Sequence, residues 1–270
     1  MKKITALKKL AKSYNSKLIE GIEHFVKAHQ FVWKNNLRKY LIISGILFLL
    51  LFEITIELVL EGVDYVEPET SKFLLEKLKM YVNLGVKEIN YGITGAFWLI
   101  KHSIESHKDS IFTSIFLVVG TPYFSIISRK ISEILLDSNN TQHSWYKEII
   151  RGLRLSMKNT VKQLLLILII TLIAFIPVIG IFTPLLTFIV QAYYNGILMT
   201  DYSLERHGYS IKESEVFYKN NKPVLFAIGL GFMFMLLIPV IGWFLAPTYA
   251  LAASGLYFSN HFKKNNGSGE

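Results

Sequence analysis

Long apolar runs alternate with charged stretches along this chain. The first run covers 40–60, and its 21 residues can cross about 30 Å of hydrocarbon at 1.5 Å per residue. The second run covers 111–127 and is interrupted by Gly120, Thr121 and Pro122. The backbone groups that Pro122 leaves unpaired need partners in protein or water, because lipid offers none. The pattern predicts two transmembrane helices.

Two similar apolar segments, at about 164–199 and 223–258, form an internal repeat. The sequence Phe175-Ile-Pro-Val-Ile-Gly180 recurs as Leu237-Ile-Pro-Val-Ile-Gly242, and a second proline follows each copy. The apolar stretches before the two tips have 13 and 15 residues, which is short for a complete crossing. The tips hold no charged residue, Asn or Asp. We therefore expect two re-entrant helical hairpins; ordinary spans with tight turns are the alternative.

The first 39 residues place apolar and basic residues at helical spacing on different sides. The apolar set is Ile4, Leu7, Ala11, Tyr14, Leu18, Ile22 and Phe25, and the basic set is Lys2, Lys3, Lys8, Lys9, Lys12 and Lys17. We expect an amphipathic helix over 1–39 that lies on an anionic membrane surface. A helix packed against a partner, or a solvated basic segment, is the alternative. The segment lacks the apolar core and cleavage site of a signal peptide.

The composition agrees with a membrane protein. Hydrophobic residues make up 51% of the chain and charged residues 18%, below the roughly 25% charged residues of soluble domains. The predicted fold is an all-α integral membrane protein with two full transmembrane helices, two half-membrane hairpins and an N-terminal amphipathic helix. Its predicted domains are 1–39 and 40–270. Because the chain has no cysteine, disulfides, thiolate metal sites and cysteine nucleophiles are excluded.

The net charge of +9 is unevenly distributed. Residues 1–39 hold ten basic and two acidic residues, residues 128–163 hold seven and three, and residues 61–109 hold six and eight. The positive-inside rule therefore places the N-terminus and 128–163 on the cytoplasmic side. Nucleic acid would also attract the lysines, but a chain embedded in lipid disfavours that partner.

Acidic residues cluster at and after the far end of the first apolar run. Glu53 and Glu57 are four residues apart and share one helix face. Carboxylates in a membrane span are candidates for coupling or gating; the alternative is that they lie at the outer interface or in protein-lined water. Residues 61–69, with Pro68, predict an acidic turn. An amphipathic helix or helix pair is expected in the rest of 61–109.

Catalytic chemistry finds little support. The seven histidines are scattered, and the sequence contains no metalloprotease, phosphate-loop or nucleophile motif. Asp201, Arg206 and His207 are interpreted as a structural polar turn between the hairpins. We expect no enzyme, no metal and no cofactor.

Several segments resemble the CysZ sulfate permease family, which belongs to the wider etoposide-induced protein 2.4 group. From about residue 150 onward the resemblance rests on both hairpin tips, on the linker Asp201-Tyr-Ser-Leu-Glu-Arg-His207 with Ser210-Ile-Lys-Glu213, and on Ala246-Pro247. Upstream, Thr121-Pro122-Tyr123 resembles the family's helix break, and Asn36-Leu37-Arg38-Lys39 resembles the turn before its first span.

The resemblance implies a multi-pass protein of the bacterial inner membrane that takes up sulfate or a related small anion for sulfur assimilation and forms homo-oligomers. It places anion binding at Asn36, Leu37, Arg38 and Lys39, with Asn36 where the family has glycine. Backbone N–H groups at a helix start and a guanidinium suit an anion; interfacial anchoring of the two cations is the alternative. The path of the anion across the membrane would be shaped by Pro122, Pro177, Gly180, Pro239 and Gly242.

A second functional hypothesis is a membrane-shaping or scaffolding protein without transport activity. In that case the two hairpins would wedge one leaflet, and the basic helix would bind anionic lipid.

Overall fold

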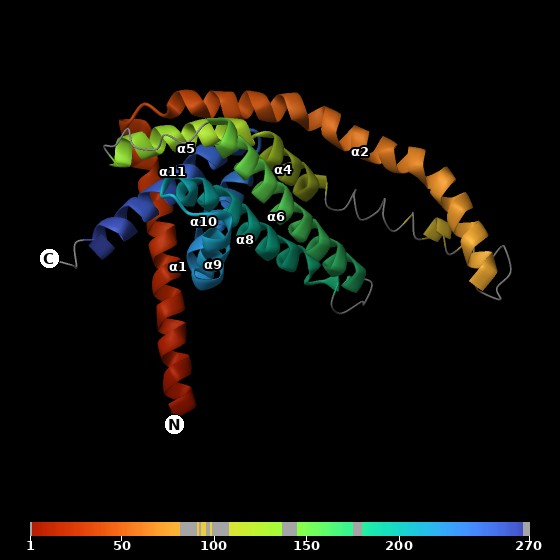
Figure 1. The fold of residues 1–270 in the computed structure, drawn as a ribbon, viewed down its shortest axis with the longest axis horizontal. Coiled ribbons are helices and arrows are strands. Elements are labelled where there is room, and N and C mark those ends of the chain that lie inside the picture. Colours follow the sequence, from red (N-terminus) through yellow and green to blue (C-terminus); the bar gives the residue numbers. More distant parts are fainter. Residues whose placement is uncertain are drawn as a thin grey trace. The chain divides into compact units, whose positions relative to one another are not determined.

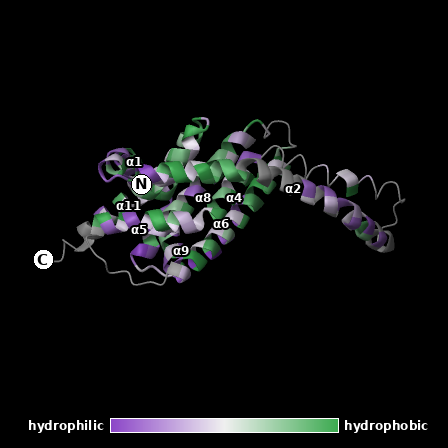
Figure 2. Cartoon of the chain, turned by 90° about the horizontal axis from the view of Figure 1, so that it is seen from above, coloured by the Kyte–Doolittle hydropathy of each residue, from purple (hydrophilic) through white to green (hydrophobic). Residues whose placement is uncertain are grey.

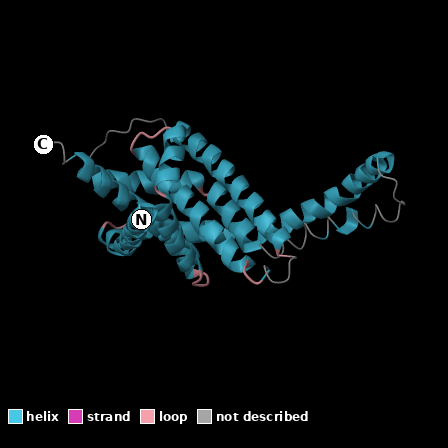
Figure 3. Ribbon diagram, turned by 90° about the horizontal axis from the view of Figure 1, so that it is seen from below, coloured by secondary structure: helices cyan, strands magenta, loops and turns pink. Residues whose placement is uncertain are grey.

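The computed structural model describes residues 2–81, 91, 93–95, 98, 108–136, 145–174 and 180–266. Every element in these ranges is a helix (Figure 3), which confirms the predicted all-α class. Figure 1 labels α1 (Lys2–Lys34), α2 (Arg38–Tyr81), α4 (Lys108–Val119), α5 (Thr121–Leu136), α6 (Trp145–Ile173), α8 (Thr183–Arg206), α9 (Ile211–Asn220), α10 (Lys222–Leu236) and α11 (Ile241–Asn266).

The chain divides into two compact units. The first unit consists of Met1–Phe48 and Leu117–Glu270, and the second of Leu49–Phe116. At the centre of the first unit, α10 packs against α8, α1 and α11. Its side chains Leu225, Ile228 and Phe232 are fully buried there. The second of the two repeated segments therefore forms the core of the first unit.

Helices α8 and α10 cross in very close contact. A Cβ atom added to Gly229 would lie well under 3.0 Å from the carbonyl oxygen of Ala192, and one added to Gly196 would lie as close to the carbonyl of Leu225. The two backbones are thus in direct contact, as small residues permit in packed helices.

The helix α2 is longer than the predicted span. It runs without a break from Arg38 to Tyr81 and includes Pro68, so the predicted acidic turn at 61–69 is wrong. A proline inside a helix removes the hydrogen bond to the carbonyl four residues earlier, here that of Asp64. Both residues are exposed, so water can reach that carbonyl, and the surrounding glutamates favour helix.

Two predictions for this region fall outside what the structure describes. The backbone is helical at Glu53 and Glu57, but their side chains lie outside the described residues. Most of 82–107 lies outside them as well. The coupling role of the two glutamates and the amphipathic helices in 61–109 therefore stay predictions.

The predicted interruption of the second apolar run is confirmed. Helices α4 and α5 meet at Gly120 with a bend of 64°, and Pro122 lies in the first turn of α5. The hydroxyl of Thr121 donates to the carbonyl of Leu117 at 3.2 Å, and the N–H of Phe124 donates to the carbonyl of Gly120 at 2.9 Å. The backbone carbonyls of Leu117 and Gly120, on either side of the break, therefore accept hydrogen bonds from groups of the protein.

Among the described residues, one helix is long and apolar enough to cross a membrane, Tyr146–Ile173 in α6; the bent α4–α5 pair also qualifies if it forms one span. Figure 2 shows hydrophobic residues over α6 and α8. Many of them are exposed, including Leu165, Ile169 and Leu172 of α6. Helix α6, which precedes the first tip, is longer than the predicted stretch of 13 apolar residues. The polar residues before that stretch belong to the same helix.

The second hairpin has the predicted turn, at 237–240 between α10 and α11. Residues 175–179 of the first tip, including Pro177, lie outside the described residues. The last glycine of each repeat has the same role. A Cβ on Gly242 would clash with the carbonyl of Met235, and one on Gly180 with the carbonyl of Ala174. Each glycine therefore lies against the end of the preceding helix, where a larger residue would not fit.

Val240 in the second tip has a φ of 61°, which is unfavourable for a β-branched residue. The left-handed conformation costs a non-glycine residue about 1–2 kcal/mol, whereas the side chain is 57% exposed and contributes little burial. After the entropy cost of glycine of roughly 0.5–1 kcal/mol, Val240→Gly should raise the free energy of unfolding by about 0.5–1 kcal/mol. Denaturant titration in detergent measures this change.

The matched control for this prediction is Val161→Gly. Val161 is also an exposed valine, but it lies inside α6, where glycine should lower stability by about 0.5 kcal/mol. Equal losses of stability in the two variants would show that Val240 is not strained.

Candidate functional site

The turn between α1 and α2 has the geometry of a helix C-cap. Asn36 has a φ of 55°, and the N–H of Leu37 donates to the carbonyl of Val32 at 3.0 Å, as in a Schellman motif. Asparagine enters the left-handed region more readily than most residues, so it can occupy this position of the turn without a glycine. Leu37 is buried and its N–H is bonded, so it fixes the turn.

Arg38 and Lys39 form the first residues of α2, and both side chains are exposed. The first N–H groups of a helix have no partner within that helix. Lys39 Nζ lies 5.3 Å from the centroid of the Tyr40 ring. Neither cation forms an ion pair with an acidic group in the described part of the chain. Two cations and a helix N-terminus are therefore open to an anion.

The first turns of α2 connect this site to two other predicted features. The hydroxyl of Tyr123, next to Pro122, donates to the carbonyl of Tyr40. One turn later, Ser44 donates to the carbonyl of Phe244 at 2.8 Å, two residues after Gly242. The structure thus brings together the predicted anion site, the helix break and the start of α11, which follows the second hairpin tip.

Two other residues that were predicted to shape the anion path, Gly180 and Pro239, do not belong to this group of bonded residues. Gly180 contacts Ala174 of its own hairpin, and no hydrogen bond or ion pair among the described residues joins it to the turn. Pro239 is exposed in the second tip.

Ser44 also stabilises the start of α11. Pro247 lies inside that helix, and because it has no N–H it leaves the carbonyl of Trp243 without its helical partner. The buried Ser44 hydroxyl lies 3.4 Å from that carbonyl oxygen, and Phe48 stacks on the Trp243 ring with centroids 4.3 Å apart. The hydroxyl has a single proton, and the carbonyl of Phe244 is the nearer of the two acceptors on α11.

A buried ion cluster joins α5, α6 and α8, and the sequence did not indicate it. Glu148 accepts two hydrogen bonds from Arg206, at 2.6 and 2.9 Å, and one from Arg129 at 2.5 Å. Arg206 also donates to the hydroxyl of Ser125 at 3.0 Å. The side chains of Glu148 and Arg206 are each 2% exposed.

A second cluster joins α6, α8 and α9. Asp201 accepts from Arg151 at 2.8 and 3.2 Å and from the hydroxyl of Tyr218 at 2.5 Å. Glu205 lies 3.3 Å from Arg151, but that guanidinium is shared with Asp201. Burial therefore raises the pKa of Glu205 to about 7. Asp201 and Arg206 are engaged by protein groups, in agreement with a structural role. The predicted polar turn is wrong for these two residues, because both lie in the last turns of α8, and His207 is the C-cap of that helix.

The family described as Sulfate transporter CysZ/Etoposide-induced protein 2.4 matches residues 24–247. The match includes the α1–α2 turn, the Pro122 break and both hairpin tips. The chain belongs to this family. The CysZ/etoposide-induced protein 2.4 family is membrane-associated, which agrees with the apolar helices of this chain. Residues 1–23 precede the match. Among proteins of curated function, none matches the chain.

Proposed function

We propose that the chain is a CysZ-type permease, and not an enzyme, that takes up sulfate or a related small anion across the bacterial inner membrane for sulfur assimilation. One observation carries the proposal. The α1–α2 turn exposes Arg38 and Lys39 at the start of a helix that is bonded, through Tyr40 and Ser44, to the Pro122 break and to the first turn of α11, which follows the second hairpin tip.

The chemistry of this turn suits a tetrahedral oxyanion. Sulfate carries two negative charges and only acceptor oxygens, so it needs several donors that converge from one side. Arg38 supplies a planar fork of N–H groups, and the start of α2 supplies backbone N–H groups and the positive end of the helix dipole. The exposed amide of Asn36 adds donors.

In this proposal α2 and the bent α4–α5 pair cross the membrane, while the two hairpins end within it. The N-terminus is cytoplasmic, and copies of the chain associate. The polar half of α6, with Glu148 and Arg151, lies before the apolar part that begins near Leu164. The exposed apolar side chains of α6 and α8 (Figure 2) support contact with lipid.

The sequence contains no nucleotide-binding motif, so we propose channel-like or ion-coupled transport. Glu53 and Glu57 are the candidates for ion coupling.

The decisive experiment is uptake of radiolabelled sulfate into proteoliposomes. Arg38→Ala should lower the initial rate by roughly ten- to a hundredfold, because a charged hydrogen bond contributes about 1.5–3 kcal/mol and 1.4 kcal/mol corresponds to a factor of ten. The matched control is Arg154→Ala, which removes an exposed arginine of α6 and should leave the rate unchanged. No uptake by the native protein above that of empty liposomes would overturn the proposal, as would equal rates for the two variants.

A further inference from the structure

Residues 2–19, which we name the basic arm, lie before the family match and have a distinctive charge. The arm contains six lysines and no acidic residue. It is helical and forms the first half of α1. Figure 1 shows this half extending beyond the helices that pack against the rest of α1.

Packing on α1 begins where the basic arm ends. In the second half of the helix, Gly21, His24, Ala28 and Val32 are buried, and α1 packs there against α10 and α11. In contrast, residues 11–16 are all exposed. At the junction, Lys17 Nζ donates to the side chain of Asn221 at 2.8 Å and to the carbonyl of Asn220 at 3.2 Å. The side chains described before this junction, those of residues 11–16, are therefore open to solvent.

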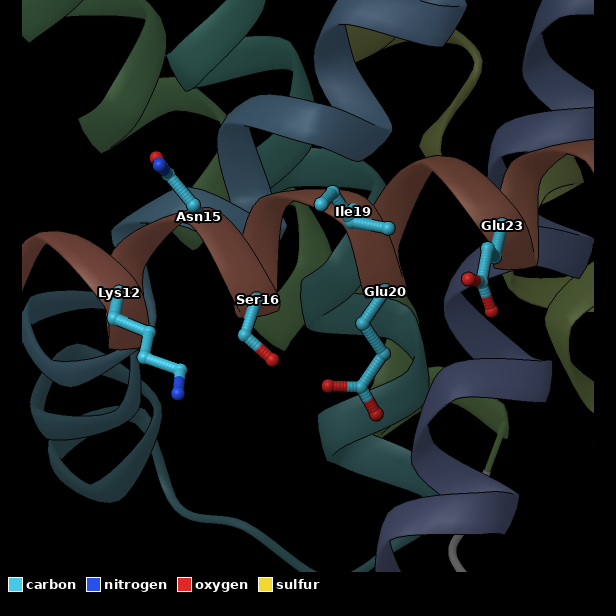
Figure 4. A pocket seen from close by; sticks show the side chains of 6 residues that line it. All are labelled: Lys12, Asn15, Ser16, Ile19, Glu20 and Glu23. Carbon is cyan, nitrogen blue, oxygen red and sulfur yellow. The ribbon is translucent and has the colours of Figure 1, made fainter.

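The two sides of the arm differ in chemistry. With 3.6 residues per turn, Ala11, Tyr14 and Ile22 share one side, and all three are exposed. The same spacing places Lys9 and Lys12 away from that side, whereas Lys8, three residues before Ala11, borders it. Figure 4 shows the side chains that line a pocket along this helix, those of Lys12, Asn15, Ser16, Ile19, Glu20 and Glu23.

We infer that the basic arm binds the surface of an anionic lipid leaflet, with the apolar side of Ala11 and Tyr14 toward the acyl chains and the lysines toward the phosphates. An amphipathic helix with this charge pattern binds through apolar burial and electrostatic attraction together. A nucleic acid would pair the lysines but leave the apolar side in water. The inference does not depend on sulfate transport, because the arm precedes the candidate anion site.

The absence of cysteine from the chain makes a depth measurement direct. Ala11→Cys and Ser16→Cys each provide one thiol for a nitroxide label, on sides of the helix that are about 140° apart. The full-length protein is placed in phosphatidylcholine nanodiscs, or in nanodiscs with equal parts phosphatidylcholine and phosphatidylglycerol. Collisions of the label with oxygen and with a water-soluble nickel chelate then report its depth.

We expect the label at residue 11 to lose access to the nickel chelate in the anionic nanodiscs alone, while the label at residue 16 keeps it. Changing Lys8, Lys9 and Lys12 to Glu should restore nickel access at residue 11, and so should high salt, which screens exposed charges. The matched control changes Lys212, Lys219 and Lys222, which are exposed lysines outside the arm, to Glu; it should leave the label buried.

Two outcomes would overturn the inference. Full nickel access at residue 11 in the anionic nanodiscs would show that the arm does not bind lipid. Equal protection of residues 11 and 16 in both lipid mixtures would show that the arm binds protein, such as a second copy of the chain.

Discussion

Gly229→Ala is expected to destabilise the folded protein by about 3 kcal/mol, at the upper end of the cost of overpacking. The added Cβ would lie well under 3.0 Å from the backbone carbonyl of Ala192 and from the backbone nitrogen of Gly196. These are backbone atoms, so no side chain can rotate away; α8 and α10 would have to separate. Thermal unfolding of the detergent-solubilised protein measures the loss.

The sign of this effect is diagnostic, because alanine is a better helix former than glycine by about 1 kcal/mol. If helix propensity were the only effect, Gly229→Ala would be more stable than the native protein. Gly62→Ala is the matched control: Gly62 also lies inside a helix, α2, and a Cβ there would meet nothing within 4 Å. That variant should be neutral or slightly stabilised. If Gly229→Ala unfolded at the same temperature as Gly62→Ala, α8 and α10 would not be in backbone contact.

The sequence predicts local features of this fold better than contacts between distant segments. The turn of the second tip and the break before Pro122 were predictable because proline, glycine and apolar runs act on the residues beside them. The crossing of Gly196 and Gly229 was not, because 17 glycines occur in the chain and nothing local says which ones meet another backbone.

The same distinction holds for the candidate site. A tight turn at Asn36 follows from asparagine's tolerance of the left-handed region, and the structure has it. The hydrogen bonds of Tyr40 with Tyr123 and of Ser44 with Phe244 join residues 83 and 200 positions apart. Hydrogen bonds between residues so far apart in the chain produce no recognisable pattern in a single sequence. The same is true of Glu148 and Arg206.

The acidic turn at 61–69 shows how a local signal can mislead. Pro68 and the acidic residues before it suggested a helix end, yet α2 continues to Tyr81. Proline ends a helix only when the freed carbonyl and the ring cannot be accommodated. On an exposed side water accepts the freed carbonyl, so surrounding helix formers prevail.

Glu148→Gln is expected to lower the free energy of unfolding by about 3–5 kcal/mol, because it leaves Arg206 as an uncompensated buried charge. The amide keeps the size of the carboxylate, so lost packing contributes little. Urea unfolding in a mild detergent measures the change. The matched control is Glu133→Gln, which also breaks an ion pair of 2.6 Å, with Lys130; those side chains are 39% and 51% exposed. That loss should stay below about 1 kcal/mol.

A double variant separates unpaired charge from lost contact. If the cost of Glu148→Gln arises from the charge left on Arg206, adding Arg206→Met should recover most of it, since neutral replacements of a buried ion pair are often tolerated. The two single changes would then be strongly non-additive, as expected of residues in one network. Additive losses would mean that each residue stabilises the junction of α5, α6 and α8 through its own contacts. Arg129, the third member of the cluster, is partly exposed, so water can solvate it when Glu148 is neutral. The penalty should therefore come from Arg206.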